Sequence, residues 1–524
     1  MNLTRRRVLA CATGAVLAPP GAARATARAA DFAALRRDLD GAVVLPGDAD
    51  YAEARQLHQP RYDAVAPGAV AYPAHERDVA VCLAFARRTG VPLVPRGGGH
   101  GYAGWATGTG LVVDTGALAA VAADGDGAVR VGAGARLGDV NASLAARGIA
   151  VPTGLCPSVG IAGLTLGGGL GVSSRAYGAT SDRLTGVRLV TPDGTVRDVD
   201  AAHDPELFWA LRGGGAGNFG VAVEFRFRSH PVGDCAFAEL HWPWRDAAAL
   251  LGGWQRWLTA LPDAFWSQVE FVVESGAGAR SGARSGAGAA DGGPVPTVRI
   301  VCLTGGRSDL DRQLTRLADL VGPRPQDVHV TTGDHGATMR LLAGCADRPA
   351  AQCRVPGRLP GHDPRGRLGR DDYAARSDFW PQDALSAPAV EVVLKALAEA
   401  EAVARERPGG GRCVVQFDGV CGGALNRVPP GATAFVHRTS AFLAQYLAYW
   451  PTAGPPEEAG RQQAWLNRLW RDLRPWAGGS AYQNYADPQL TDWRTAYYGA
   501  NLARLEQVKR AVDPDRLFRF PQGV

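Results

Sequence analysis

The chain contains little methionine, carries little net charge and lacks the short cysteine and histidine spacings of metal sites. Two methionines are too few for a flexible, methionine-lined groove. A formal net charge of +5 gives no reason to expect nucleic acid or an anionic membrane surface as a partner. The sequence has no CxxC or HxxxH pair, so no metal site is predicted. The composition therefore gives no indication of nucleic acid, a membrane surface or a metal ion as a partner.

Cysteines are too widely spaced for the framework of a small disulfide-rich domain. The nearest pairs are Cys345 with Cys353 and Cys413 with Cys421. One or two disulfides are compatible with a location outside the cell, and the spacing does not assign either pair.

The N-terminus is predicted to be a targeting segment. Residues 4–9 contain Arg5, Arg6 and Arg7 and resemble a twin-arginine export signal, which we expect to span residues 1–30. The following apolar stretch is too short to span a membrane, so no stable membrane anchor is expected. A disordered basic tail is the alternative. We expect export by the twin-arginine machinery to the cell surface, the periplasm or the medium.

Two glycine-rich segments are the most informative features of the chain. The first runs from Arg96 to Gly104 and contains His100; the second runs from Gly154 to Asp182 and contains Cys156. Glycine lets the backbone approach a bound group closely and offers N–H donors to phosphate oxygens. The two segments therefore indicate one large phosphorylated cofactor held from two sides. Neither has the strand–GxGxxG–helix order of a Rossmann dinucleotide site.

Periodicity predicts an α+β fold in more than one domain, because 524 residues exceed one ordinary core. Short strands and helices alternate to about residue 232. Longer helices then predominate, at residues 248–258, 309–320 and 388–404, with strands at 269–273, 297–303 and 413–417. This second part indicates a sheet covered by helices. Residues 275–294 consist largely of Gly, Ala, Ser and Arg and are predicted to be a disordered surface loop.

Four segments in order resemble the berberine-bridge-enzyme-like branch of the FAD-linked oxidases, whose FAD domain is of the p-cresol methylhydroxylase type. They are residues 95–104, 154–182, 204–220 and the C-terminal stretch from Tyr482 onward. The resemblance implies a two-part FAD-binding domain with an inserted substrate domain of antiparallel sheet covered by helices. The expected boundaries are 31–233 for the FAD domain, 234–475 for the substrate domain and 476–524 for the segment that completes the FAD domain.

The resemblance also implies that the flavin is bound bicovalently, with His100 on its 8α-methyl group and Cys156 on C6. Imidazole and thiolate are nucleophiles able to attack an electron-poor flavin ring. The alternatives are a turn histidine satisfied by the backbone and an inert buried thiol. The other residues expected to bind FAD are Arg96, Gly97, Gly98, Gly99, Gly101, Gly160, Gly163, Gly167, Gly168, Gly169, Asp182, Asn218, Phe219, Gly220 and Asn484.

Catalytic candidates come from two segments. The resemblance favours Tyr485 as the base that takes a hydroxyl proton, with Tyr482 second. A phenol of pKa about 10 needs a neighbouring flavin or cation for this role. An extended segment would point the two tyrosines, three positions apart, to opposite faces. Gln416 and Asp418 alternate onto one face of a strand and would orient substrate or assist the base. Packing aromatics and solvent-facing strand polars are the respective alternatives.

The predicted function is oxidation of an alcohol, hemiacetal or related C–H group of a sugar, glycoside or polycyclic natural product. Hydride would pass to covalently bound FAD, and O2 would reoxidise the flavin to give H2O2. The alternatives are an oligosaccharide oxidase acting at the anomeric carbon, a natural-product tailoring oxidase, and a flavin-binding protein without turnover.

Overall fold

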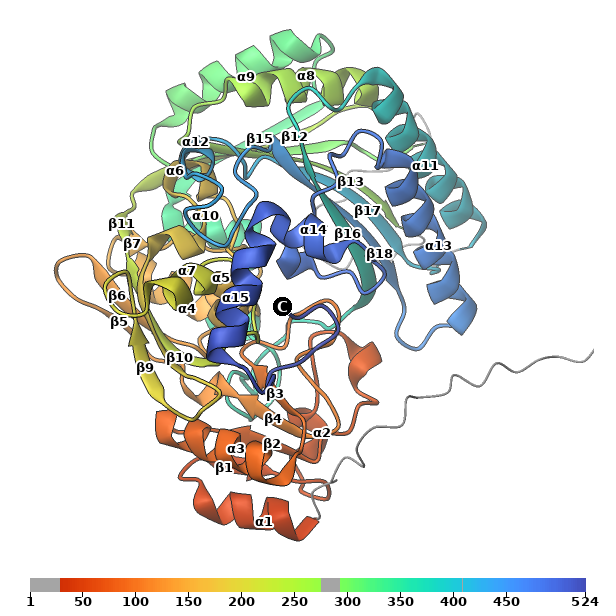
Figure 1. The fold of residues 1–524 in the computed structure, drawn as a ribbon. Helices are drawn as coiled ribbons and strands as arrows, with labels where there is room; N and C mark the ends of the chain where they lie inside the picture. The colour runs from red at the N-terminus through yellow and green to blue at the C-terminus, as the bar shows by residue number, and fades with distance from the viewer. Residues whose placement is uncertain (1–28, 275–292, 408) are drawn as a thin grey trace, which may run out of the picture.

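The computed structural model of the chain describes residues 29–274, 293–407 and 409–524 (Figure 1). The predicted signal at residues 1–30 lies outside the described residues except for its last two, and the predicted loop at 275–294 except for residues 293 and 294. Among the described residues, no helix has the length and apolar character needed to cross a bilayer.

The N-terminal part of the chain folds around a four-stranded sheet of order β1-β2-β4-β3. Strands β2 and β3 run parallel to β4, whereas β1 pairs antiparallel with β2. Helices α1 and α3 lie beside the sheet and bury Phe32, Val79 and Leu83 in its core (Figure 1). The bounds are α1 Ala29–Asp38, β1 Ala42–Val44, β2 Ala69–Tyr72, α3 Glu76–Thr89, β3 Leu93–Arg96 and β4 Leu111–Asp114.

A five-stranded antiparallel sheet of order β5-β6-β10-β8-β9 follows. Its core contains Val129, Val187 and Phe225 together with Leu137 of α4 and Trp209 of α7. The bounds are β5 Val121–Ala123, β6 Ala128–Gly132, α4 Leu137–Ala145, α5 Ile161–Leu166, β8 Leu184–Val190, β9 Val196–Val199, α7 Pro205–Leu211 and β10 Val221–Arg228.

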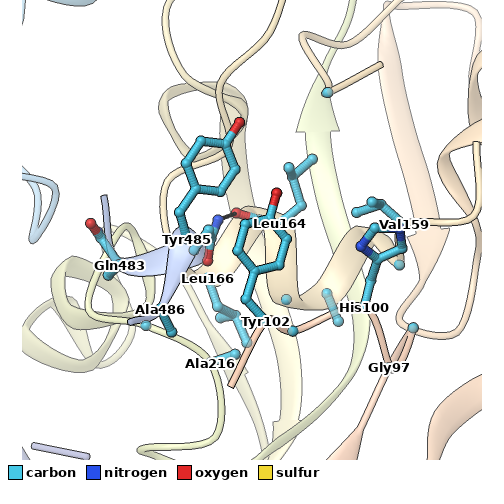
Figure 2. Close-up of a pocket in the computed structure, with 18 of the residues that line it drawn as sticks. Gly97, His100, Tyr102, Val159, Leu164, Leu166, Ala216, Gln483, Tyr485 and Ala486 are labelled. Atoms are coloured by element: carbon cyan, nitrogen blue, oxygen red, sulfur yellow. Dashed lines mark hydrogen bonds between the residues drawn. The ribbon is translucent and has the colours of Figure 1, made fainter. Parts of the chain in front are cut away.

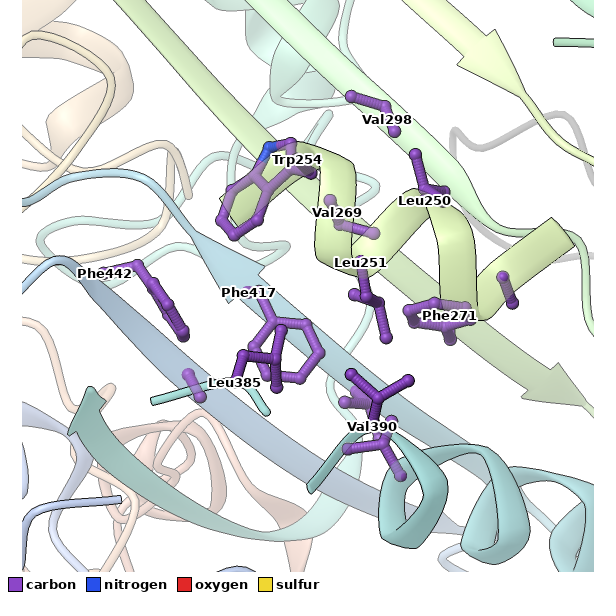
Figure 3. Packing of buried hydrophobic residues seen from close by; sticks show 14 of the residues in the cluster. Leu250, Leu251, Trp254, Val269, Phe271, Val298, Leu385, Val390, Phe417 and Phe442 are labelled. Atoms are coloured by element: carbon purple, nitrogen blue, oxygen red, sulfur yellow. The ribbon is translucent and has the colours of Figure 1, made fainter. Parts of the chain in front are cut away.

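The third sheet has seven antiparallel strands in the order β15-β12-β14-β13-β17-β18-β16. Apolar residues of its helix-facing side pack with α8, α9, α11 and α13, as Leu251 of α8, Val390 of α11 and Phe417 of β17 show (Figures 1 and 3). The sheet covered by helices is therefore confirmed. The bounds are β12 Asp234–His241, α8 Ala247–Thr259, β13 Phe265–Glu274, β14 Thr297–Cys302, α9 Arg307–Val321, β15 Asp327–Asp334, β16 Asp372–Trp380, α11 Ala387–Glu406, β17 Arg412–Asp418, β18 Phe442–Trp450 and α13 Pro456–Leu473.

The C-terminal segment returns from the large sheet to the five-stranded one. Helix α15 packs against α7, and the Lys509 ammonium donates to the backbone carbonyl of Asn218 at 2.6 Å. The backbone N–H of Val524 donates to the Asn218 side chain at 3.0 Å. This return places the residues around Tyr485 between the seven-stranded sheet and the glycine-rich segments of the N-terminal part. The remaining elements are α2 Tyr51–Ala54, β7 Ile149–Ala150, α6 Ser174–Tyr177, β11 His230–Pro231, α10 His335–Leu342, α12 Gly423–Arg427, α14 Trp493–Tyr498 and α15 Leu502–Val512.

One of the two nearest cysteine pairs forms a disulfide. Cys345 and Cys353 are bonded, whereas Cys413 and Cys421 are free and buried. Strand β17 accounts for the difference, because it begins beside Cys413 and ends before Cys421. Its extended residues, at about 3.3 Å each, hold the two thiols far apart.

Candidate active site

One cavity of about 650 Å³ lies between the glycine-rich segments, the seven-stranded sheet and the C-terminal segment. Fifteen of the residues predicted to form the site line it, and Figure 2 shows part of the wall. The set comprises Arg96, Gly97, Gly98, Gly99, His100, Gly101, Cys156, Gly160, Gly163, Gly220, Gln416, Asp418, Tyr482, Asn484 and Tyr485. Gly167, Gly168, Gly169, Asp182, Asn218 and Phe219 are not among the residues lining it.

His100 lies in the turn that follows β3. Its imidazole stacks on that of His58, with ring centroids 3.6 Å apart. Burial, and then the nearby His58 and Arg136, hold the pKa of His100 well below its usual range. The ring is therefore neutral at physiological pH and has an unprotonated nitrogen. The Arg96 side chain points elsewhere: it is buried, pairs with Asp114 and donates to the Ala54 carbonyl at 2.6 Å.

The two glycine-rich segments meet backbone to backbone. A Cβ added to Gly98 would lie 2.3 Å from the Gly160 nitrogen, and one added to Gly160 would lie 2.6 Å from the Gly98 nitrogen. Arg136 joins the segments, because its guanidinium donates both to the Gly98 carbonyl and to the Ser158 carbonyl. Only glycine fits at this contact, which brings the segments of His100 and Cys156 to one cavity wall.

The wall also has places where backbone faces open space. A Cβ at Gly101 or Gly163 would meet no atom within 4 Å apart from those of its own chain neighbours and, for Gly163, of its own helix. The Cys156 side chain is exposed to the cavity, and burial raises its pKa. A concave wall of bare backbone, with an imidazole and a thiol in its two segments, fits a large planar cofactor with phosphate groups.

Gly167, Gly168 and Gly169 make close contacts behind this wall. A Cβ on Gly167 would lie 2.0 Å from the Asn484 side-chain oxygen, and Gly168 and Gly169 have φ of +108° and +82°. The Gly169 N–H donates to the Tyr482 hydroxyl at 3.0 Å. These glycines therefore let the C-terminal segment approach the cavity wall.

Three other predicted cofactor residues are occupied elsewhere. Asp182 forms a two-pronged ion pair with the buried guanidinium of Arg438, both bonds being 2.7 Å. Asn218 donates to the Gly214 carbonyl at 2.9 Å and anchors the C-terminus, while Phe219 is packed in the core. The neighbouring Gly215, Ala216, Gly217 and Gly220 reach the cavity instead.

The tyrosine pair differs from the extended arrangement predicted for it. Residues Gln483–Tyr485 form a 3₁₀ turn, in which positions three apart lie on the same side. Tyr482 and Tyr485 are therefore neighbours, with ring centroids 5.0 Å apart, and both line the cavity. Tyr485 also stacks on Tyr102 with centroids 5.2 Å apart, and Figure 2 shows the parallel rings. The Tyr482 hydroxyl is already occupied, since it accepts from Gly169 and from Asn484.

The neighbours that shift the pKa of the Tyr485 phenol, among the described residues, do not include a cation. Burial raises its pKa well above the usual value, and nearby Tyr102 and Asp418 add to that effect. Its hydroxyl is thus protonated at physiological pH. The neutral Tyr485 phenol can form hydrogen bonds. It could accept a proton only if a bound group stabilised its phenolate.

Across the cavity, the seven-stranded sheet presents polar residues on the side opposite the helices. Asp418 accepts from the Trp266 indole N–H at 2.6 Å and lies 3.5 Å from the amide nitrogen of Gln416. Burial raises the pKa of Asp418 to about 7. A carboxyl group that titrates near neutral pH inside a cavity has the properties of a general acid or base.

Several cavity residues were not singled out from the sequence. Gln445 of β18 lies opposite Gln416 and donates to the Tyr102 hydroxyl at 2.8 Å. Glu270 and Arg299 form an ion pair of 2.8 Å in the cavity wall. Of these residues, only Gln445 could have been singled out from the sequence. It is the one glutamine in the apolar run of residues 442–450, and a polar side chain on a buried strand needs a hydrogen-bond partner.

The fold and the cavity fit an enzyme that binds a large phosphorylated cofactor, and comparison with known families identifies that cofactor. The model of the FAD binding domain matches residues 67–200, and the model of berberine and berberine-like proteins matches residues 481–524. The chain is therefore an FAD-linked oxidoreductase that resembles berberine-bridge-enzyme-like proteins, which confirms the predicted resemblance and FAD as the cofactor.

Similar proteins extend the likeness to nearly the whole chain. The FAD-linked oxidoreductase YgaK of Bacillus subtilis is 29% identical over 498 residues, covering 93% of this chain and 97% of its own length. The xylooligosaccharide oxidase of Thermothelomyces thermophilus is 28% identical, with 87% of each chain covered. The solved structure of Physcomitrella patens BBE-like 1 is 26% identical, with a TM-score of 0.79 and coverage of 94% and 98%.

Proposed function

We propose that the chain is an exported oxidase that holds FAD through two covalent bonds and oxidises a CH–OH group of a hydroxylated substrate. One observation carries this proposal: a single cavity collects His100, Cys156, Asp418 and Tyr485 from four separate segments. His100 and Cys156 suit cofactor attachment, Asp418 suits proton transfer, and Tyr485 suits a hydrogen bond to a substrate hydroxyl.

Covalent attachment is supported by the neutral imidazole of His100 and by the position of Cys156 in the cavity wall. The lowered pKa of His100 leaves a ring nitrogen free to form a bond, here to the flavin 8α-methyl group. Cys156 opens into the same cavity, where its sulfur would attach to flavin C6. The backbone of Gly97–Gly101, Gly160 and Gly163 would hold the rest of FAD. The Arg96, Asp182, Asn218 and Phe219 side chains, by their contacts, would support the surrounding loops.

Bound FAD supplies a two-electron acceptor, which O2 would regenerate with release of H2O2. We assign Tyr485 to hydrogen-bond the substrate hydroxyl, because it lines the cavity and its own hydroxyl has no protein hydrogen-bond partner among the described residues. We assign Asp418 as the group that finally takes the hydroxyl proton, since a pKa of about 7 lets it ionise near neutral pH. Gln416 keeps the Asp418 carboxyl oriented, and Tyr482 positions Asn484 and the glycine-rich wall.

The cavity wall favours a sugar or glycoside over an apolar polycyclic substrate. Gln268, Gln416 and Gln445 present amides, and Trp266 and Tyr102 add aromatic surface. Gln416 and Gln445 each donate one bond within the protein, to Asp418 and Tyr102, and a hydrocarbon ring system would leave the remaining donors and acceptors of the three amides unpaired, whereas a polyol can pair with them. The similar protein named xylooligosaccharide oxidase supports the same substrate class. Oxidation at the anomeric carbon of an oligosaccharide is the specific form of this proposal.

Peroxide release from a substrate panel tests the function. We expect H2O2 and anaerobic bleaching of the flavin with xylo-, cello- or chito-oligosaccharides, and little of either with polycyclic alcohols. Asp418→Asn and Tyr485→Phe should retain the flavin colour and lose most of the activity. Bleaching by polycyclic alcohols alone would favour a natural-product tailoring oxidase. A flavin that no substrate reduces would favour a binding protein without turnover.

We also propose export through the twin-arginine machinery, from the Arg5–Arg7 motif, and domain boundaries at 31–233, 234–475 and 476–524. Substituting Arg5, Arg6 and Arg7 together by lysine should retain the protein in the cytoplasm of a twin-arginine-competent host. Unchanged export of that variant would contradict this route.

A further inference from the structure

Two histidines and two carboxylates gather at the outer edge of the seven-stranded sheet. Strand β15 is the edge strand and pairs with β12, as Figure 1 shows. Their register sets His241 opposite Asp327 and Glu239 opposite His329. Because directly paired residues, and residues two apart on a strand, share a face, all four side chains lie on one side of the sheet. This is the side opposite α8 and α9, since the intervening Ala238 and Leu240 pack in the helix-covered core.

The potential ligand atoms are already close together. The Asp327 carboxylate oxygen lies 2.8 Å from His329 Nε2 and 3.4 Å from His241 Nδ1, and one ligand atom from each of the three residues lies within 4.8 Å of the others. Tetrahedral zinc, with bonds of about 2.0–2.1 Å, needs ligand atoms about 3.3 Å apart. We propose that His241, Asp327 and His329 bind a divalent transition-metal ion, Zn2+ by ligand type, with its fourth position open to water.

The surroundings supply an outer shell for such a site. His241 is only 7% exposed, and its second ring nitrogen lies 3.7 Å from a Glu239 oxygen. The other Glu239 oxygen accepts from Arg299 at 2.8 Å, and Arg299 in turn donates to Glu270 at 2.8 Å. A carboxylate behind a metal-binding histidine fixes the ring orientation and tautomer. Arg299 and Glu270 line the cavity, so the outer shell of the metal site reaches the cavity wall.

A second cluster in the chain provides a contrast. Asp40, His75 and Asp78 also lie within 4.8 Å of one another. The Asp78 carboxylate, however, already accepts three backbone N–H groups, from Asp40, Gly41 and Ala74. Its oxygens are therefore committed to holding the chain turn, whereas the Asp327 carboxylate contacts only imidazoles among its described partners. His75 thus offers a matched control.

Calorimetric titration of the untagged, EDTA-treated flavoprotein with ZnCl2 tests the site. We expect one Zn2+ per chain, with affinity at least tenfold lower in His329→Ala and in Asp327→Asn and unchanged in His75→Ala. The side chains of His329 and Asp327 are 54% and 46% exposed, so both variants should fold, and retained flavin absorbance checks this. No binding to the wild type, or equal binding to all variants, would overturn the proposal. Neither result bears on the oxidase assignment, because the metal ligands lie outside the flavin wall.

Discussion

Replacing Asp418 by asparagine should raise the free energy of unfolding above neutral pH and lower the turnover rate. Burial raises the pKa of Asp418 from 3.8 to about 7, so the folded state holds this proton more tightly than the unfolded chain does. The stability that the neutral carboxyl provides is present below about pH 4 and is lost as the pH rises through 7. At about 1.4 kcal/mol per pH unit, the ionised carboxylate costs about 4 kcal/mol at pH 8.

Asparagine removes that cost and keeps an acceptor for the Trp266 indole N–H, which bonds Asp418 at 2.6 Å. The free energy of unfolding of Asp418→Asn should therefore exceed that of the wild type at pH 8, and the difference should shrink toward zero at pH 4. Urea unfolding at a series of pH values measures it. Over the same range, wild-type turnover should rise with an apparent pKa near 7, whereas residual Asp418→Asn turnover should not.

A difference in unfolding free energy that does not change between pH 4 and pH 8 would refute the reasoning about Asp418. So would an Asp418→Asn variant less stable than the wild type at pH 8. Either result would mean that the carboxylate is stabilised as a charged group in the folded protein.

Other substitutions test separate parts of the account. Gly98→Ala places a methyl group 2.3 Å from a backbone nitrogen of the facing glycine-rich segment, and should lower the free energy of unfolding by about 1–3 kcal/mol and remove most of the bound flavin, as measured by urea unfolding and absorbance. Gly101→Ala should unfold like the wild type, because its methyl group would meet no atom within 4 Å apart from those of its chain neighbours. Equal stability of the two variants would contradict the contact at Gly98. Tyr485→Phe should lower the anaerobic rate of flavin reduction about 10²-fold or more with full flavin content, and an unchanged rate would remove this tyrosine from catalysis. Replacing Cys345 and Cys353 together by alanine opens a disulfide loop of sequence separation 8 and should lower the unfolding free energy by about 2.5 kcal/mol in non-reducing buffer, an effect that should vanish when both proteins are reduced.

Local sequence signals predicted much of the fold. The helices predicted at residues 248–258, 309–320 and 388–404 are α8, α9 and α11, each one or two residues longer at its ends than predicted. Strands β16 and β18 were missed, because their faces are buried on both sides and the period-two alternation disappears.

Residues of the cavity wall could be singled out where one segment carries a sequence motif, and not where strand pairing brings residues together. His100 and Cys156 stand in recognisable glycine runs, and both reach the cavity. The tyrosine pair was misplaced because an isolated segment does not reveal a 3₁₀ turn. His241 and His329 lie on strands whose pairing is a tertiary property, so no short motif marks the proposed metal site.

The central claim, two covalent bonds to FAD in one cavity, is tested most directly by intact mass under denaturing conditions. Wild type, His100→Ala, Cys156→Ala and the double variant should be measured after acid precipitation. The account predicts the mass of one FAD on the wild type and on each single variant, and none on the double variant. Flavin released entirely from the wild type by acid would contradict both covalent bonds. A double variant that still carries FAD would place the attachment on other residues.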